Sequence, residues 1–199
     1  MTAKKIEIFL KKFKWDRLCK MYGSAHSSLI GFISTTWISQ SQSHAVLDGA
    51  PSSSRGRGRR GQKNADILLC RQKKPYIVVE VESGASNYLD KIRSIEGYLR
   101  NTKEFNGVQF GLLVMTNMYG LHKGENCWDR IEDKVKKLKV AIAFVSVEKR
   151  KVKLGASLSP LDRLRHLNGY SNKSIVKIDY RVHTPTQDKL GTLYRENEK

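Results

Sequence analysis

Three acidic side chains, Asp66, Glu80 and Glu82, lie in two short apolar runs near the middle of the chain. The run 75–83 is rich in β-branched residues, which is typical of a strand, and the run 65–70 resembles it. An unpaired charge in such a run is expensive to bury, so carboxylates there pair with a cation or coordinate a metal ion. The three acids therefore predict a hard-cation site at the ends of two strands.

Residues 71–74 separate the two runs and are short enough to form a hairpin turn. Side chains alternate between the two faces of a strand, so Glu80 and Glu82 share a face with Tyr76 and Val78. If the hairpin forms, Asp66 lies on the strand next to this face. The pattern thus predicts that the acids converge.

Two or three carboxylates and a substrate phosphate make a sufficient site for Mg²⁺, which prefers oxygen ligands and keeps several waters. Bound there, Mg²⁺ orients and activates a water and polarises a phosphodiester; Mn²⁺ is the alternative metal. A structural role is the competing interpretation. In that case the two glutamates face solvent, paired with Lys73 or Arg93, and Asp66 accepts hydrogen bonds in a turn.

Apolar periodicity indicates an α/β fold. The predicted helices cover residues 4–22, 29–38, 88–99, 126–138 and 159–169, and the predicted strands cover 44–48, 65–70, 76–82, 108–115, 140–147 and 174–183. This order implies a mixed central sheet with helices on both faces. Residues after Thr184 show no clear pattern, and we expect them to be loosely held.

The chain has 199 residues, with 37 lysines and arginines against 19 acids, a formal net charge of +18. This excess favours a polyanionic partner, nucleic acid before an anionic membrane; a basic protein kept soluble by its charge is the alternative. No apolar run approaches the ~20 residues of a membrane span, and we expect no membrane partner. The widely spaced Cys19, Cys70 and Cys127 predict no zinc site and favour a reducing, cytoplasmic compartment.

A Gly/Ser/Arg-rich tract at residues 49–62 cannot bury a core, and we expect a flexible basic loop. Its position directly before Asp66 favours contact with the nucleic-acid backbone over a merely solvated loop. The candidate nucleic-acid-binding residues are Arg55, Arg57, Arg59, Arg60 and Lys63.

The spacing of Asp66, Glu80 and Glu82, followed by an amphipathic helix and two apolar strands, resembles the core of the PD-(D/E)xK nuclease superfamily. The resemblance covers roughly residues 44–147 and implies a restriction-endonuclease-like fold and a divalent-metal-dependent nuclease. It also implies that Asp66 and Glu80 are metal ligands. Restriction endonucleases, Holliday-junction resolvases and several repair nucleases share this fold.

The sequence departs from the pattern of that superfamily at three places. Ala65 replaces the motif proline, and Glu82 replaces the motif lysine, as it does in some restriction enzymes. Lys91, on the flank of the predicted helix that also carries Tyr98, is the candidate substitute for that lysine; an ordinary rim lysine is the alternative. The third departure is that the predicted helix 29–38 contains no acid.

We therefore predict a single nuclease domain with a restriction-endonuclease-like core. N-terminal helices (1–40) precede the catalytic core (44–147), and a helix and strand appendage (155–199) follows it. The expected function is Mg²⁺-dependent cleavage of double-stranded DNA by Asp66, Glu80, Glu82 and Lys91, as a small type II restriction endonuclease working as a homodimer. The alternatives are a structure-selective nuclease of the Holliday-junction resolvase or repair type, and a non-catalytic basic DNA-binding protein.

Overall fold

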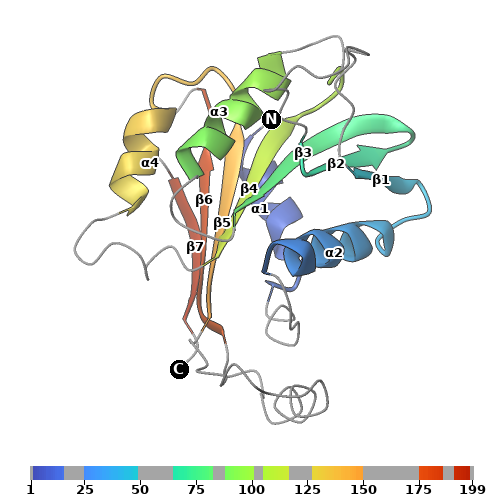
Figure 1. The fold of residues 1–199 in the computed structure, drawn as a ribbon, viewed down its shortest axis with the longest axis horizontal. Coiled ribbons are helices and arrows are strands. Elements are labelled where there is room, and N and C mark those ends of the chain that lie inside the picture. Colours follow the sequence, from blue (N-terminus) through green and yellow to red (C-terminus); the bar gives the residue numbers. More distant parts are fainter. Residues whose placement is uncertain are drawn as a thin grey trace, which may run out of the picture.

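The described part of the chain forms one mixed seven-stranded β-sheet with helices on both faces (Figure 1). The computed structural model describes residues 2–15, 25–48, 65–82, 88–100, 105–116, 127–149, 175–185 and 191–197. The strands are β1 (His44–Asp48), β2 (Ile67–Arg71), β3 (Lys74–Glu82), β4 (Phe110–Thr116), β5 (Ile142–Lys149), β6 (Ile175–His183) and β7 (Gly191–Asn197). The helices are α1 (Ala3–Lys11), α2 (Ala25–Ile38), α3 (Tyr88–Arg100) and α4 (Cys127–Val135).

The strands lie in the sheet in the order in which they occur in the chain. β3, β4 and β5 are parallel, and every other neighbouring pair is antiparallel. Parallel neighbours need a crossover connection, and α3 and α4 lie in the two crossovers. The α/β class and the mixed sheet predicted from the sequence are confirmed.

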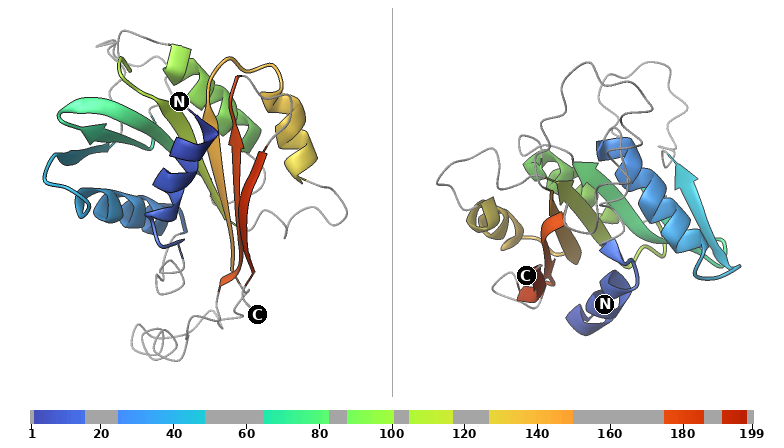
Figure 2. Two further views of the ribbon diagram at one scale, coloured as in Figure 1. Left: turned by 180° about the vertical axis from the view of Figure 1, so that it is seen from behind. Right: turned by 90° about the horizontal axis from the view of Figure 1, so that it is seen from below.

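Two apolar layers, one on each face of the sheet, form the core. Ile77, Val79 and Val81 belong to the layer beneath α1 and α2, whereas Val78 belongs to the layer beneath α3 and α4. Figures 1 and 2 show these helix pairs on opposite sides of the sheet. The central strand β4 is buried on both faces, as its continuous apolar run predicts.

A two-residue turn joins β2 and β3. Gln72 and Lys73 have φ values of 51° and 60°, and positive φ at both central positions is the signature of the type I′ hairpin turn. The predicted hairpin is confirmed, and it makes the two acid-bearing segments neighbours.

A bulge in this hairpin turns Tyr76 away from the face that Val78 and Glu80 share. Leu69 pairs with Ile77 and Cys70 pairs with Pro75, so Tyr76 is the extra residue on β3. Tyr76 instead packs against the layer beneath α1 and α2, where its ring stacks on Trp37 with centroids 6.0 Å apart. The prediction that Tyr76 shares the face of the glutamates is wrong.

Both ends of the chain differ from the sequence-based prediction. α1 ends at Lys11, and Lys14 has a φ of 43°, so the predicted helix does not continue through this residue. β7 pairs with β6 along residues that we expected to be loosely held. The two large apolar residues of β7 are adjacent rather than alternating, so the sequence pattern does not predict this strand. The pairing with β6 identifies it. The predicted helix 159–169 lies outside the described residues.

Candidate active site

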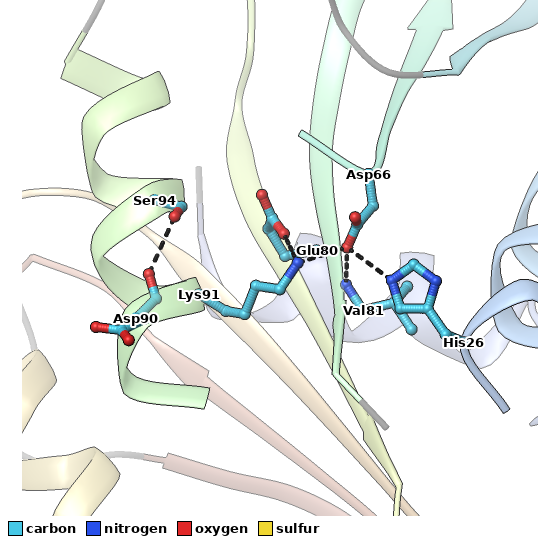
Figure 3. Close-up of polar contacts among 7 residues, drawn as sticks. All are labelled: His26, Asp66, Glu80, Val81, Asp90, Lys91 and Ser94. Atoms are coloured by element: carbon cyan, nitrogen blue, oxygen red, sulfur yellow. Dashed lines mark hydrogen bonds and ion pairs between the residues drawn. The ribbon is translucent and has the colours of Figure 1, made fainter. Parts of the chain in front are cut away.

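The hairpin places Asp66 and Glu80 side by side. Ile67 pairs with Val79 in the antiparallel register of β2 and β3, so Asp66, one residue earlier, lies opposite Glu80, one residue later. The two carboxylates are therefore cross-strand neighbours, as predicted. Figure 3 shows both of them beside α3.

Lys91, in the first turn of α3, bridges the two carboxylates (Figure 3). Its Nζ lies 2.9 Å from Asp66 Oδ2 and 2.5 Å from Glu80 Oε2. The prediction that Lys91 points across the sheet toward the acids is confirmed. One ammonium thus marks a position where an oxygen from each carboxylate approaches the same cation.

The position of Lys91 depends on a close approach between α3 and β4. A Cβ added to Gly111 on β4 would overlap Cγ2 of Ile95, so only glycine permits this distance between helix and sheet. Ile92 and Ile95 are fully buried on the same helix and fix its rotation. The packing of Ile95 against Gly111 therefore determines where Lys91 lies, because Ile95 follows Lys91 by four residues on the same helix.

Asp66 accepts hydrogen bonds from both the backbone and a side chain. Its Oδ2 accepts a hydrogen bond of 2.8 Å from the backbone N–H of Val81 in addition to the one from Lys91. Burial alone would raise the pKa of Asp66, but these two donors outweigh it and hold the pKa below its usual range. Asp66 is a carboxylate at neutral pH.

The pKa of Glu80 shifts in the opposite direction from that of Asp66. Glu80 is only 1% exposed, and this burial raises the pKa of its carboxyl to about 7. The hydrogen bond from Lys91 opposes the rise, and the negative charge of Asp66 adds to it. Burial lowers the pKa of Lys91, but its contacts with Glu80 and Asp66 outweigh this and raise it. Near neutral pH, therefore, Asp66 and Lys91 are charged, whereas Glu80 is partly protonated.

Two further residues belong to the site and were not predicted as members of it. His26, in the first turn of α2, places Nε2 3.4 Å from Asp66 Oδ2. Tyr98, seven residues after Lys91 on the same helix face, is hydrogen-bonded to Glu80; burial and then the negative charge of Glu80 raise the pKa of its phenol. The spacing of Lys91 and Tyr98 is a signal that could have found the tyrosine. No local pattern singles out His26, because its position depends on how α2 packs.

The remaining predicted site residues are Glu82 and five basic residues. Glu82 lies two residues beyond Glu80 on β3 and is partly buried, and the contacts that join Asp66, Glu80 and Lys91 do not depend on it. The basic residues predicted to bind nucleic acid lie outside the described residues: Arg55, Arg57, Arg59, Arg60 and Lys63.

The oxygen donors of this cluster fit a hard divalent cation. Asp66 and Glu80 already converge on one cationic atom, and carboxylate oxygen is the ligand type that Mg²⁺ and Mn²⁺ prefer. Lys91 is 24% exposed and stands on a flexible stem, so its ammonium is able to move aside. Within the described ranges, no group of three or more His, Cys, Asp or Glu side chains is arranged to hold a metal. Asp66 and Glu80 are the two residues that could hold such an ion, and water or substrate would have to complete its shell.

The comparisons with protein-family models, with curated proteins and with solved structures each give no match. No helix in the described part of the chain is both long and apolar enough to cross a membrane.

Proposed function

We propose that the protein is a metal-dependent endonuclease that hydrolyses DNA phosphodiester bonds. The observation that carries the proposal is the convergence of Asp66, directly before β2, and Glu80, on the adjacent strand β3, upon a single cationic position. The net charge of +18 supports a polyanionic substrate. The resemblance of the acid spacing to the PD-(D/E)xK nucleases supports the reaction class.

Asp66 and Glu80 would hold Mg²⁺, which when bound supplies a more acidic water and a Lewis acid for the phosphodiester. The N–H of Val81 fixes the orientation of Asp66, and the Tyr98 hydroxyl does the same for Glu80. Lys91, displaced from the carboxylates, would offer its positive charge to the phosphate oxygens as their negative charge grows.

Within this class we propose a small type II restriction endonuclease. A duplex has two strands, so cutting both requires two active sites and favours a homodimer. A structure-selective nuclease of the resolvase or repair type uses the same site on branched DNA. Discrete fragments from plasmid DNA support the first form, and selective cutting of a four-way junction supports the second.

A non-catalytic DNA-binding protein is the second candidate. The observation that favours it is the position of Lys91, which already neutralises the carboxylates without a metal ion. In that case Asp66, Glu80 and Lys91 form a structural ion-pair network in a basic protein.

Cleavage of supercoiled plasmid in Mg²⁺ or Mn²⁺ tests the proposal. We expect Asp66→Asn and Glu80→Gln each to lower the cleavage rate at least about a hundredfold, because each removes an anionic ligand. DNA binding in a mobility-shift assay is expected to survive, since neither change removes a positive charge. The matched control is Asp90→Asn on α3, whose side chain is 49% exposed and pairs with Arg93 away from the cluster.

The two candidates differ in this assay. A nuclease loses cleavage in the Asp66 and Glu80 variants and keeps it in the Asp90 variant. Salt-sensitive DNA binding with no cleavage by the unaltered protein, in either metal, would reject hydrolysis and leave the binding protein.

A further inference from the structure

A pocket lies on the face of the sheet opposite the candidate active site, between α1, the end of α2 and the β2–β3 hairpin. Its volume is about 410 Å³. Figure 2 shows α1 and α2 together on this side of the sheet. None of the candidate catalytic residues lines it.

The pocket has a cationic rim. Lys5 from α1, Lys12 at the C-cap of α1 and Arg71 from the hairpin line it, and no carboxylate does so among the described residues. The nearby acid of α1, Glu7, is engaged by Lys11 at 2.7 Å. Three positive charges with no acid between them favour an anionic ligand.

The wall of the pocket is aromatic. The rings of Trp37 and His44 stack with centroids 3.7 Å apart and planes 4° apart, and Tyr76 lies nearly parallel to Trp37 at 15°. His44 is fixed in this orientation because its Nδ1 lies 3.0 Å from the carbonyl oxygen of Trp37. His44 and Tyr76 are only partly buried, so this ring stack reaches the accessible part of the pocket.

The pocket is also lined by Gln40, whose side-chain amide is a hydrogen-bond donor. The Nε2 of Gln40 is buried and has no hydrogen-bond acceptor in the described part of the chain. A buried donor without an acceptor lowers stability, and an oxygen of a ligand that reaches it would remove that cost. Ser41 and Ser43, whose hydroxyl groups are hydrogen-bonded to each other at 3.0 Å, also line the pocket.

We propose that this pocket binds one nucleotide, with its phosphate at Lys5, Lys12 and Arg71 and its base against the aromatic wall. Positive charge beside a stacking surface is the combination by which proteins hold unpaired nucleotides. The nucleotide has two possible sources, a free mononucleotide or an unpaired residue of a nucleic-acid strand.

The pocket and the candidate active site lie at opposite ends of α2. His26 and Trp37 are eleven residues apart on this helix, which at 1.5 Å per residue corresponds to about 16 Å. The pocket therefore does not compete with Asp66 and Glu80 for the same phosphate. Nucleotide binding here does not depend on hydrolysis at the other site, so the two proposals fail independently.

Calorimetric titration of the full chain tests the proposal with four probes: deoxyadenosine monophosphate, deoxyadenosine, inorganic phosphate and a single-stranded deoxyadenosine pentamer. The test variant is Lys5→Gln/Lys12→Gln. The matched control, Lys4→Gln/Lys14→Gln, removes the same charge from neighbouring exposed positions that do not line the pocket. Asp66→Asn serves as a second control and is expected to bind like the unaltered protein.

We expect the monophosphate or the pentamer to bind with a dissociation constant at least tenfold lower than that of the nucleoside or phosphate. The test variant is expected to raise that constant at least tenfold, and the control variant less than twofold. Binding of the monophosphate identifies a free-nucleotide site, and binding of the pentamer alone identifies a strand-binding site. The proposal is overturned if neither probe binds, if phosphate binds as tightly as the nucleotide, or if both double variants lose affinity equally.

Discussion

The buried carboxyl of Glu80 makes the stability of the protein depend on pH in a direction that can be calculated. Its pKa is about 7 in the folded protein against 4.5 in the unfolded chain. Below pH 4.5 the group is neutral in both states. Between pH 4.5 and 7 the folded state binds more protons, so stability falls as the pH rises through this window.

The size of the effect follows from the shift, at ~1.4 kcal/mol per pKa unit. Relative to a neutral group, Glu80 lowers the free energy of unfolding by about 1 kcal/mol at pH 5 and by about 3 kcal/mol at pH 8. Glutamine has the shape of the protonated acid and does not titrate. We therefore expect Glu80→Gln to gain stability over the unaltered protein by about 2 kcal/mol more at pH 8 than at pH 5.

Urea unfolding of both proteins at pH 5 and pH 8, without divalent metal, measures this change. Asp66 does not contribute to it, because its lowered pKa keeps it ionised across the range. The control is Asp90→Asn on the solvent side of α3, whose effect on stability is expected to be the same at both pH values. A Glu80→Gln gain that stays constant or shrinks toward pH 8 would refute the raised pKa.

Three further outcomes are expected. Mg²⁺ at ten times its dissociation constant should stabilise the unaltered protein by about 1.4 kcal/mol, a rise of roughly 3–6 °C in Tm by thermal unfolding, and should leave Asp66→Asn unchanged. Gly111→Ala should lower the free energy of unfolding by about 1–3 kcal/mol in urea, because its Cβ would overlap Ile95. Gly97→Ala, on the exposed face of α3 with no atom within 4 Å of the new Cβ, should raise the free energy of unfolding by up to ~1 kcal/mol in the same assay.

Local patterns in the sequence were sufficient to predict the strands that carry the acids. Alternation along β3 separates Val79 from Glu80, and the short hairpin brings Asp66 next to Glu80. Helical periodicity in α3 likewise predicts the side on which Lys91 lies. In each case the relevant residues are close in the chain, so a period of two or 3.6 residues determines their direction.

The features that the sequence did not predict depend on contacts between distant segments. His26 reaches Asp66 because α2 packs under the sheet, 40 residues before the carboxylate in the chain. Tyr76 lies on the face opposite Glu80 because β3 has one more residue than β2 at the bulge. No feature of the composition marks this bulge. Glu80 and Glu82 look equivalent in the sequence, yet only Glu80 is fully buried, because burial depends on α3 lying over that part of the strand.

The placement of Lys91 shows how a helix can supply the charge that a strand position lacks. β3 has an acid, Glu82, where the resemblance leads one to expect a lysine, so the strand alone would place Asp66, Glu80 and Glu82 together without a nearby cation. Lys91 restores a positive charge at the two innermost acids, but from an element whose distance from the sheet depends on Gly111. The charge balance of the site and the packing of α3 on β4 are therefore coupled. A substitution that shifts α3 outward would weaken both Lys91 contacts while leaving the Asp66–Val81 hydrogen bond, which lies within the hairpin, intact.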